Sequence, residues 1–439
     1  MSDILELNDK IKSFNKIIKV SGDKSLSIRW VLFASIANGI SKSHNLLKSE
    51  DVLTAINIIK KLGIKVIQRK NVCIIYGKGL SGYKTNKKIT LNSGNSGTVG
   101  RLILGLLIDT QQHVKLIGDK SLSRRDFKRI TDPLKKFGAA FKITGKKYLP
   151  ITIKGTKNLK PINYLEKKGS AQCKSSVILA ALKTKGVTSI KAKKSRNHTE
   201  LMCKYLKLPI KIRSRKNFDI IKVSQTKKIK PFSYNIPSDI SSASFFIILT
   251  VLTNSSSITL KDVNINPSRT GVIKILNLMG IKVIFKNKRI YKGELIADIK
   301  VKTPKKIKAI NCPVNLNSGA IDEFLIIFLI AAKAKGVSYF KNLEELNQKE
   351  SPRLKWGAKI LRKMGIKTVL TKSSIKIFGN PHLDINKKII IKNYLKDHRV
   401  FMTCVIAALS FGGKWRIHNK NCFKTSFPNF LNLIKEIKK

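Results

Sequence analysis

The chain is short of acidic residues, of closely spaced cysteines and of long apolar runs. Its 439 residues include six cysteines, at positions 73, 173, 203, 312, 404 and 422, and no two of them form a CxxC pair. This scatter argues against a disulfide framework and against a metal site. The longest apolar stretches, residues 245–252 and 324–332, are far shorter than the roughly 20 residues of a membrane-spanning helix. The sequence therefore excludes a membrane protein and predicts buried helices at these two stretches.

The beginning of the chain lacks the signals of a targeting segment. Residues 1–16 alternate charged with apolar residues and contain neither a continuous apolar core nor a Ser/Arg-rich stretch poor in acids. Hydrophobic residues make up 42% of the composition, which is typical of a globular chain, and the length suffices for two or three domains. We therefore expect a folded cytoplasmic protein.

Acidic residues are outnumbered by basic ones, 25 to 88, so the formal net charge is +63. Such a charge normally indicates nucleic acid, an anionic surface or an anionic substrate as the partner. Here, however, lysine is spread through nearly every segment, with no basic tail, no interleaved aromatic residues and no nucleic-acid-binding motif. We interpret most lysines as decoration of solvated faces. Arginine is scarce beside lysine, and its positions are more informative.

An internal repeat organises the chain. A helical pattern that ends in glycine and is followed by a strand recurs at Gly63, Gly138, Gly280 and Gly365, in segments such as KKLGIKVI and RKMGIKTV. A fifth copy, YLKLPIKI, has Pro209 instead of glycine, and FLNLIKEI near the C-terminus resembles a sixth copy. Glycine just past a helix is the usual left-handed cap, so each copy marks a helix end. The sequence thus predicts six units of roughly seventy residues.

Each unit also contains an earlier and more apolar helix. These helices are expected at residues 25–38, 96–109, 171–183, 241–252, 321–334 and 399–410. Helices that are apolar almost all round belong in the middle of a domain, and short β-branched stretches such as VCIIYG and ITIKG indicate strands between them. We predict an α/β fold with three units per domain: residues 1–20 with 236–439, and residues 21–235. The chain would cross over within residues 231–237.

Basic residues recur at the predicted helix starts, where the helix dipole disfavours them. They are Arg29, Arg101, Arg125, Arg196, Arg269, Lys349, Arg353 and Arg399. Ser, Thr, Asp and Asn at the same places are explained in part as ordinary N-caps. Cations at a helix start are explained if an anion is bound there by backbone N–H groups, hydroxyls and guanidinium groups together. We expect a substrate with at least two anionic groups, bound where two three-unit domains face each other.

The order of these motifs resembles the 3-phosphoshikimate 1-carboxyvinyltransferase (EPSP synthase) family. The resemblance rests on GDKSLSIR, GNSGT, GDKSLSRRD, SAQCKS, SRNHTE, NPSRTG, IDE, LEELNQKES, DHR and SFP, in this order from about residue 20 to residue 428. It implies two inside-out α/β domains, each of three βαβαββ repeats. It also implies transfer of the enolpyruvyl group of phosphoenolpyruvate to the 5-hydroxyl of shikimate 3-phosphate, with release of phosphate, in chorismate and aromatic amino acid biosynthesis.

The resemblance also implies roles for individual residues. Those for shikimate 3-phosphate are Lys24, Ser25, Arg29, Ser170, Ala171 through its backbone, Gln172, Arg196, Asp322 and Lys349. Those for phosphoenolpyruvate are Lys24, Asn95, Gly97, Arg125, Gln172, Arg353 and Arg399. Arginine suits this task because its planar fork matches phosphate and carboxylate groups better than lysine does. His198 is expected to be structural, at a helix start where Glu200 is in a capping arrangement.

The chemistry that the resemblance implies is addition followed by elimination, without a cofactor or a metal. Asp322, expected to open a buried helix, is the candidate base for the 5-hydroxyl proton, with Lys349 close by. Glu350 is the candidate acid that protonates C3 of phosphoenolpyruvate, if exclusion of water raises its pKa. Lys24 is the alternative acid. Acids at helix starts are also often simple dipole partners, so this interpretation stays open for both carboxylates.

Two departures from the family pattern and two alternatives remain. Pro352 stands where the family commonly has aspartate, and Thr425 stands where some members have a lysine. The nearest alternative is the related transferase acting on UDP-N-acetylglucosamine, but the loop that carries its cysteine acid reads GDKSLSRRD here, without cysteine. The other is a basic nucleic-acid-binding protein, supported by the charge alone. We expect a monomer whose partners are the two small substrates, with no nucleic acid and no membrane.

Overall fold

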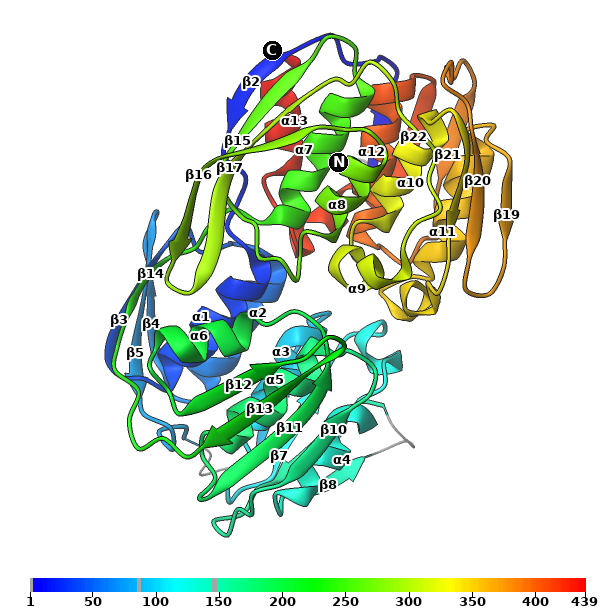
Figure 1. The fold of residues 1–439 in the computed structure, drawn as a ribbon. Coiled ribbons are helices and arrows are strands. Elements are labelled where there is room, and N and C mark those ends of the chain that lie inside the picture. The colour runs from blue at the N-terminus through cyan, green and yellow to red at the C-terminus, as the bar shows by residue number, and fades with distance from the viewer. Residues whose placement is uncertain (1–2, 85–87, 144–147) are drawn as a thin grey trace. The chain divides into compact units, whose positions relative to one another are not determined.

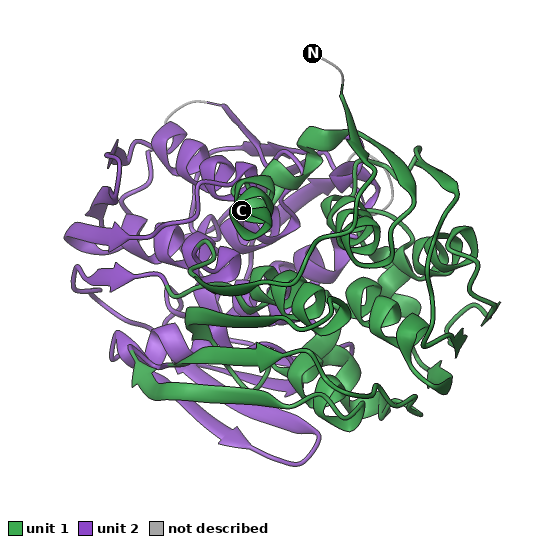
Figure 2. Ribbon diagram, turned by 90° about the horizontal axis from the view of Figure 1, so that it is seen from above, with its two compact units in different colours: residues 1–21, 237–291, 295–439 green, residues 22–236, 292–294 purple. Residues whose placement is uncertain are grey.

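A computed structural model of the chain describes residues 3–84, 88–143 and 148–439. The chain divides into two compact units (Figures 1 and 2). Unit 1 contains residues 1–21, 237–291 and 295–439, and unit 2 contains residues 22–236 and 292–294. The sequence placed the boundaries after residues 20 and 235. The three residues 292–294, at the turn between two strands, were not anticipated in unit 2.

Unit 2 contains three four-stranded sheets within its described residues (Figure 1). Their strand orders are β14 (Ser233–Asn235), β3 (Asn38–His44), β5 (Val72–Lys78), β4 (Lys65–Gln68); β6 (Ile89–Asn92), β7 (Val114–Ile117), β9 (Ile151–Lys154), β8 (Ala140–Ile143); and β10 (Asn163–Glu166), β11 (Val187–Lys193), β13 (Phe218–Ser224), β12 (Ile210–Ser214). In each sheet the first two strands pair in parallel and the other pairs are antiparallel. The three sheets are therefore copies of one pattern.

Unit 1 also has three sheets in the part of the chain that the structure describes. Their strand orders are β16 (Val283–Tyr291), β17 (Glu294–Lys302), β15 (Ser257–Asn264), β2 (Asn15–Ile18); β18 (Gly336–Phe340), β20 (Ile375–Gly379), β19 (Thr368–Leu370); and β1 (Ile4–Leu7), β22 (Lys414–His418), β21 (Lys388–Ile391). Strand β2 pairs in parallel with β15, and β1 pairs antiparallel with β22. The start of the chain thus completes two sheets of the C-terminal half.

Each repeat contributes two helices, as the sequence predicted. The apolar ones are α1 (Lys24–Ser35), α3 (Gly97–Leu106), α5 (Ala171–Ala181), α7 (Ile240–Leu252), α10 (Phe324–Lys333) and α12 (His398–Phe411). The second helices are α2 (Glu50–Lys61), α4 (Lys128–Lys136), α6 (His198–Tyr205), α8 (Gly271–Leu278), α11 (Arg353–Lys363) and α13 (Phe430–Lys438), and a short α9 (Asn317–Ala320) precedes α10. All six predicted apolar helices are present, with ends shifted by a few residues.

The apolar helices fill the middle of each unit. All residues of α7 are buried, and α7, α10 and α12 pack on one another inside unit 1 (Figure 1). In unit 2, α3 packs on α1 and on α5. Helices that bury every face need no polar stripe, which explains why their sequences show little amphipathic pattern. Among the described residues, no helix is both long and apolar enough to cross a membrane.

The predicted glycine caps are confirmed. Gly63, Gly138, Gly280 and Gly365 have φ angles between +84° and +109°, a backbone conformation that glycine adopts without steric cost. In the fifth copy the equivalent turn is made by Lys207, with φ of +55°, two residues before Pro209. The repeat therefore keeps its helix-to-strand turn even where the glycine is missing.

Candidate active site

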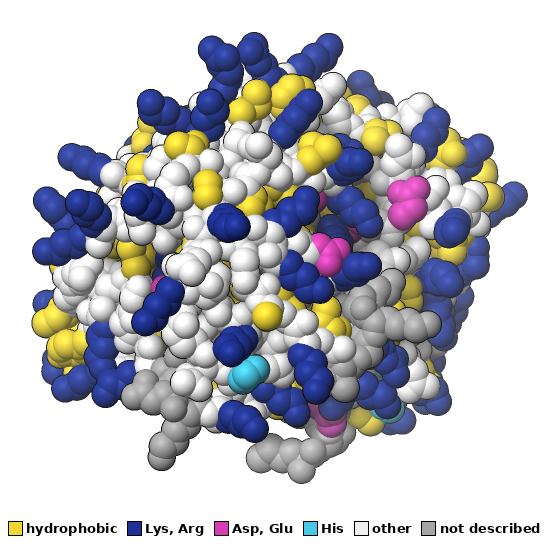
Figure 3. Space-filling model, turned by 90° about the horizontal axis from the view of Figure 1, so that it is seen from below, with side chains coloured by type: hydrophobic (Ala, Val, Ile, Leu, Met, Phe, Trp, Pro, Cys, Tyr) yellow, Lys and Arg dark blue, Asp and Glu magenta, His cyan; other side chains and the backbone are white. Residues whose placement is uncertain are grey.

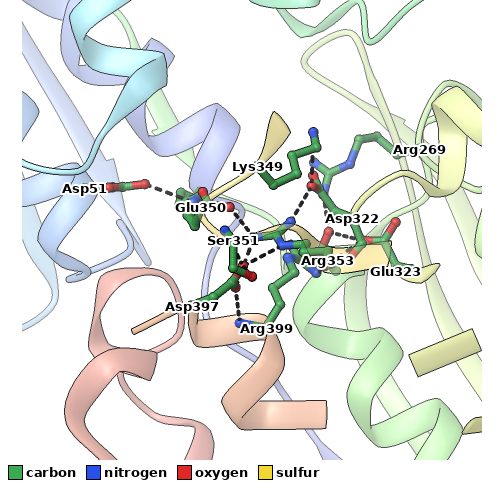
Figure 4. Close-up of polar contacts among 12 residues, drawn as sticks. Asp51, Arg269, Asp322, Glu323, Lys349, Glu350, Ser351, Arg353, Asp397 and Arg399 are labelled. Atoms are coloured by element: carbon green, nitrogen blue, oxygen red, sulfur yellow. Dashed lines mark hydrogen bonds and ion pairs between the residues drawn. The ribbon is translucent and has the colours of Figure 1, made fainter. Parts of the chain in front are cut away.

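Five predicted site residues of unit 1 come together around one carboxylate (Figure 4). Asp322 Oδ1 lies 3.3 Å from Arg353 Nη1 and 3.7 Å from Lys349 Nζ. Arg399 Nη1 donates a hydrogen bond of 2.8 Å to the backbone carbonyl of Asp322. Glu350 forms an ion pair with Arg353 Nη2. The arrangement places two carboxylates and three cations from two repeats at one place in this unit.

The local backbone of this cluster differs from the prediction. Asp322 does not open the buried helix: it lies in a turn, and α10 begins two residues later, at Phe324. Lys349 and Glu350 lie in the loop before α11, whose N-cap position is taken by Pro352. At both places the predicted site residues lie on the segment before a helix, and binding and catalytic residues are often found on loops that a rigid scaffold holds.

Asp397 is the residue of this cluster that the sequence did not single out, although it belongs to the DHR motif. It is fully buried at the N-cap of α12, where its side chain accepts hydrogen bonds from the backbone N–H groups of Arg399 (2.9 Å) and Ser351 (3.2 Å). It also accepts from Ser351 Oγ at 2.8 Å and from Arg353 Nε at 2.9 Å. Asp397 thereby joins the loop before α11 to the start of α12.

In the Asp397–Arg353 pair, the pKa shifts of both residues favour the charged form. Burial is the largest single influence and acts to raise the pKa of Asp397, but the charges of Arg353 and His398 and the hydrogen bond from Arg353 together outweigh it, and the pKa is lowered. Burial acts to lower the pKa of Arg353, but Asp397, Glu350 and Asp322 outweigh it and the pKa is raised. Arg353 is therefore held as a permanent cation by carboxylates on several sides.

In unit 2, the predicted phosphoenolpyruvate residues form a group at the start of α3. Arg125 Nη2 donates to Asn95 Oδ1 at 2.9 Å and lies 3.3 Å from Ser121 Oγ. A Cβ atom on Gly97 would stand 2.8 Å from Arg101 Nη1 and 3.3 Å from Arg125 Nη1. The two guanidinium groups thus converge on Gly97, the first residue of α3, which has no side chain.

Arg101 joins this group, although the sequence assigned it no substrate. Its Nη1 donates to Gln172 Oε1 at 2.6 Å, and Gln172 Nε2 donates to Thr98 Oγ1 at 2.9 Å. A guanidinium group can only donate, so it fixes which end of the Gln172 amide is the oxygen. Desolvation lowers the pKa of Arg101 to about 10. The pattern of arginines at helix starts includes Arg101, but it does not predict the contact of Arg101 with Gln172.

The predicted shikimate 3-phosphate residues gather at the starts of α1, α5 and α6. Arg29 Nε donates to Thr199 Oγ1 at 2.7 Å, and its Nη2 donates to Ser175 Oγ at 3.1 Å. Burial lowers the pKa of Arg29 to about 10; Glu200 is the main group that opposes this shift, and the charge of Arg196 adds to it. The charge of Arg196 thus acts on the buried guanidinium group of Arg29.

Four further predicted residues complete this part of unit 2. Lys24, the first residue of α1, forms an ion pair with Asp51 at 2.9 Å, and Ser25 follows it in the same turn. Ser170 caps α5 by accepting from the N–H of Cys173 at 3.3 Å, and Ala171 is the first residue of that helix. The capping role of Ser170 leaves its hydroxyl hydrogen for a second contact.

Two helix starts depart from the prediction. Arg125 and Arg196 lie before α4 and α6 rather than in their first turns. Glu200 makes no capping contact but forms an ion pair with Lys174 at 2.6 Å. His198 is buried and its Nδ1 lies 2.7 Å from Glu294 Oε1, which agrees with a structural role. Glu200 thus has Lys174 as a distant partner, in place of the local capping contact that the SRNHTE pattern indicated.

The described part of the chain offers no candidate metal centre. Within these residues, no group of three or more His, Cys, Asp or Glu side chains could hold a metal ion. The six cysteines are buried free thiols.

The fold identifies a class of enzyme. The structure is similar to that of the enolpyruvyl transferase NikO from Streptomyces tendae, with a TM-score of 0.78 over 100% of this chain and 98% of that one, at 13% identity. It is also similar to EPSP synthase from Acinetobacter baumannii, with a TM-score of 0.87 and 34% identity, covering 99% and 98% of the two chains. The fold is therefore that of the enolpyruvyl transferases, with two inside-out α/β domains of three repeats each.

The sequence comparisons narrow the class to one family. The family model described as EPSP synthase (3-phosphoshikimate 1-carboxyvinyltransferase) matches residues 8–434. The 3-phosphoshikimate 1-carboxyvinyltransferases of Ruthia magnifica and Petrotoga mobilis are 40% and 35% identical to this chain, each over 97% of it and over 96% and 98% of their own lengths. The chain belongs to the EPSP synthase family. It transfers the enolpyruvyl group of phosphoenolpyruvate to the 5-hydroxyl of shikimate 3-phosphate and releases phosphate.

Proposed function

We propose that the cations of unit 2 bind the two anionic substrates in separate groups. The observation that carries this proposal is the buried guanidinium group of Arg29, which the hydroxyls of Thr199 and Ser175 hold and on which the positive charge of Arg196 also acts. An anion bound by both arginines offsets these positive charges. We assign the 3-phosphate and ring of shikimate 3-phosphate to this group, together with Lys24, Ser25, Ser170, the backbone of Ala171, and Gln172 from the same helix starts.

Phosphoenolpyruvate is assigned to the group around Gly97. Asn95 and Arg125 lie together there, and Arg101 holds the oxygen of Gln172. The amide nitrogen of Gln172 donates one hydrogen to Thr98 and has a second hydrogen for an anion. In unit 1, Arg353 and Arg399 are the assigned partners, and Lys24 is shared between the two substrates. Phosphoenolpyruvate carries a phosphate and a carboxylate, and the planar guanidinium groups of these arginines match both kinds of group.

The proton transfers are assigned to unit 1, with Lys24 of unit 2 as an alternative donor. Asp322 takes the proton of the 5-hydroxyl as that oxygen attacks C2 of phosphoenolpyruvate, and Lys349 stays beside the carboxylate. Either Glu350 or Lys24 protonates C3; loss of a proton from C3 and of phosphate from C2 then completes the reaction. Because Glu350 is paired with Arg353, it must weaken this ion pair before it can donate a proton.

Substitution of Arg125 and substitution of Arg196 should weaken the binding of different substrates. Arg125→Ala should raise the Michaelis constant for phosphoenolpyruvate far more than the dissociation constant of shikimate 3-phosphate, because an anion that loses its fork partner loses about 2–5 kcal/mol. Arg196→Ala should show the opposite preference. Calorimetric titration of shikimate 3-phosphate, combined with steady-state kinetics at saturating shikimate 3-phosphate, measures both. Equal losses for both substrates in both variants would refute the assignment.

Gly97→Ala should weaken phosphoenolpyruvate binding while leaving the free protein folded. The new methyl group would meet Arg101 Nη1 at 2.8 Å, and Arg101 cannot withdraw without giving up its hydrogen bond to Gln172. Overfilling a packed site in this way costs about 1–3 kcal/mol. The Michaelis constant for phosphoenolpyruvate reports the loss, and the dissociation constant of shikimate 3-phosphate is the internal control. An unchanged Michaelis constant would mean that the two arginines adjust freely.

We also propose that the protein works as a cytoplasmic monomer without nucleic acid. Lysine and arginine side chains are spread over the face seen in Figure 3 instead of forming one band along it. Nucleic-acid binding relies on a basic patch or stripe, so this spread supports small anions as the partners. Six free thiols are typical of a reducing compartment. Retention on DNA that neither substrate displaces would argue for the alternative.

A further inference from the structure

Unit 2 contains a buried ion pair that makes none of the substrate contacts assigned above. Lys174, in α5, lies 2.6 Å from Glu200, in α6, and their side chains are 0% and 2% exposed. Removing two charges from water is costly, and apolar side chains of the same size would often serve stability equally well. The position of the pair therefore needs another explanation than the joining of two helices.

Arg29 lies directly beside this pair. Arg29 donates to the backbone carbonyl of Ser25 and to the hydroxyls of Ser175 and Thr199. Ser175 directly follows Lys174 in the sequence, and Thr199 directly precedes Glu200. The two hydroxyls also contact each other at 2.6 Å. Arg29 is thus held by neutral hydroxyl groups, while the nearby carboxylate of Glu200 is engaged by Lys174.

This arrangement matters because a carboxylate and a substrate phosphate compete for the same guanidinium group. An arginine already paired with a buried carboxylate has fewer free N–H donors and less net positive charge to offer an anion. With Glu200 neutralised by Lys174, the three charged groups together keep one positive charge, and hydroxyl contacts orient Arg29 without neutralising it.

We propose that Lys174 is a positioning residue that holds Glu200 away from Arg29, so that Arg29 stays available for the phosphate of shikimate 3-phosphate. The inference rests on the proposed role of Arg29 as a ligand of this substrate. Lys174 itself touches no substrate and acts only through Glu200.

The test is a pair of substitutions measured by calorimetric titration of shikimate 3-phosphate. Lys174→Met leaves Glu200 without its lysine, so Glu200 should turn to Arg29 and weaken shikimate 3-phosphate binding by about 10-fold or more. Adding Glu200→Gln to Lys174→Met removes the competing carboxylate and should restore the dissociation constant to within about 3-fold of the wild-type value. The Michaelis constant for phosphoenolpyruvate should stay nearly unchanged throughout.

The same helix offers a matched control for loss of stability. Lys183, two residues beyond the end of α5, is also buried and forms an ion pair of 2.5 Å with Asp109. Lys183→Met should lower the unfolding temperature without weakening shikimate 3-phosphate binding, since Lys183 lies at the opposite end of the helix from Ser170. Equal weakening by Lys183→Met and Lys174→Met would overturn the inference.

Two further variants separate the possible failures. If Lys174→Met does not fold, Glu200→Gln alone decides: it should bind shikimate 3-phosphate at least as tightly as the wild type, and a 10-fold loss would contradict the proposal. Arg29→Met tests the underlying assignment. Normal binding by Arg29→Met would refute the role of Arg29 itself, whereas loss in Arg29→Met together with normal binding by Lys174→Met would refute only the role of Lys174.

Discussion

Replacing Asp322 by asparagine should lower the turnover number by about 100-fold or more, the effect expected of a positioned proton-transfer group. Asparagine keeps the shape of the side chain and an oxygen for Arg353 and Lys349, but it cannot accept the proton of the 5-hydroxyl. The contact of Arg399 with this residue should survive, because it is made to the backbone carbonyl.

Binding measurements decide whether this loss belongs to the chemical step. The dissociation constant of shikimate 3-phosphate and the Michaelis constant for phosphoenolpyruvate should each change by no more than a few fold. Glu323→Gln, which alters the neighbouring carboxylate that lies 3.5 Å from Arg399, is a matched control and should keep most of the turnover. A wild-type turnover number for Asp322→Asn would reduce Asp322 to a partner of the two cations.

Replacing Asp397 by alanine should destabilise unit 1 by about 3–5 kcal/mol, because it leaves the buried guanidinium group of Arg353 without its main partner. The same change removes the N-cap of α12 and the acceptor for Ser351. Urea unfolding measures the loss of free energy. The exposed ion pair of Asp384 and Lys10 in the same unit provides the control: Asp384→Ala should cost no more than about 1 kcal/mol.

The pH dependence of this effect has a definite sign. Burial acts to raise the folded-state pKa of Asp397, but the charges of Arg353 and His398 and the hydrogen bond from Arg353 together lower it. The carboxylate therefore contributes its full stability above the value of about 4 that an unfolded aspartate has. The contribution is lost as the pH falls through the lower folded-state pKa. The stability difference between the wild type and Asp397→Ala should therefore shrink on acidification below about pH 4. A difference that is constant down to pH 2 would contradict the ionic role of Asp397.

The repeat architecture could be predicted because its signals are local. A glycine such as Gly280 follows its helix directly, and an apolar run such as that of α10 stands out along the chain. The candidate residues were found for the same reason, since each sits in a short motif. The loop before α11 was not predicted from the sequence, because Lys349 was expected at a helix start.

The contacts that organise the site were missed because they join distant parts of the chain. Asp397 and Arg353 are 44 residues apart, and Arg101 and Gln172 are 71 residues apart. No local pattern distinguishes a capping aspartate from one that also pairs with a buried arginine. For Glu200, the local pattern predicted a capping contact, but the actual partner is Lys174, which is distant in the sequence.

The pairing of the first strand, β1, with the last strand, β22, sets an order of folding during synthesis on the ribosome. Residues 22–236 form nearly all of unit 2 and are complete when little more than half of the chain has been synthesised. Strand β1 has to wait for β22, because Leu5 pairs with Ile417. Domains generally fold as units while synthesis proceeds, so unit 2 can fold early while the first residues stay unpaired. A nascent chain that stops before residue 414 would expose β1 as an open edge, ready to pair with another chain.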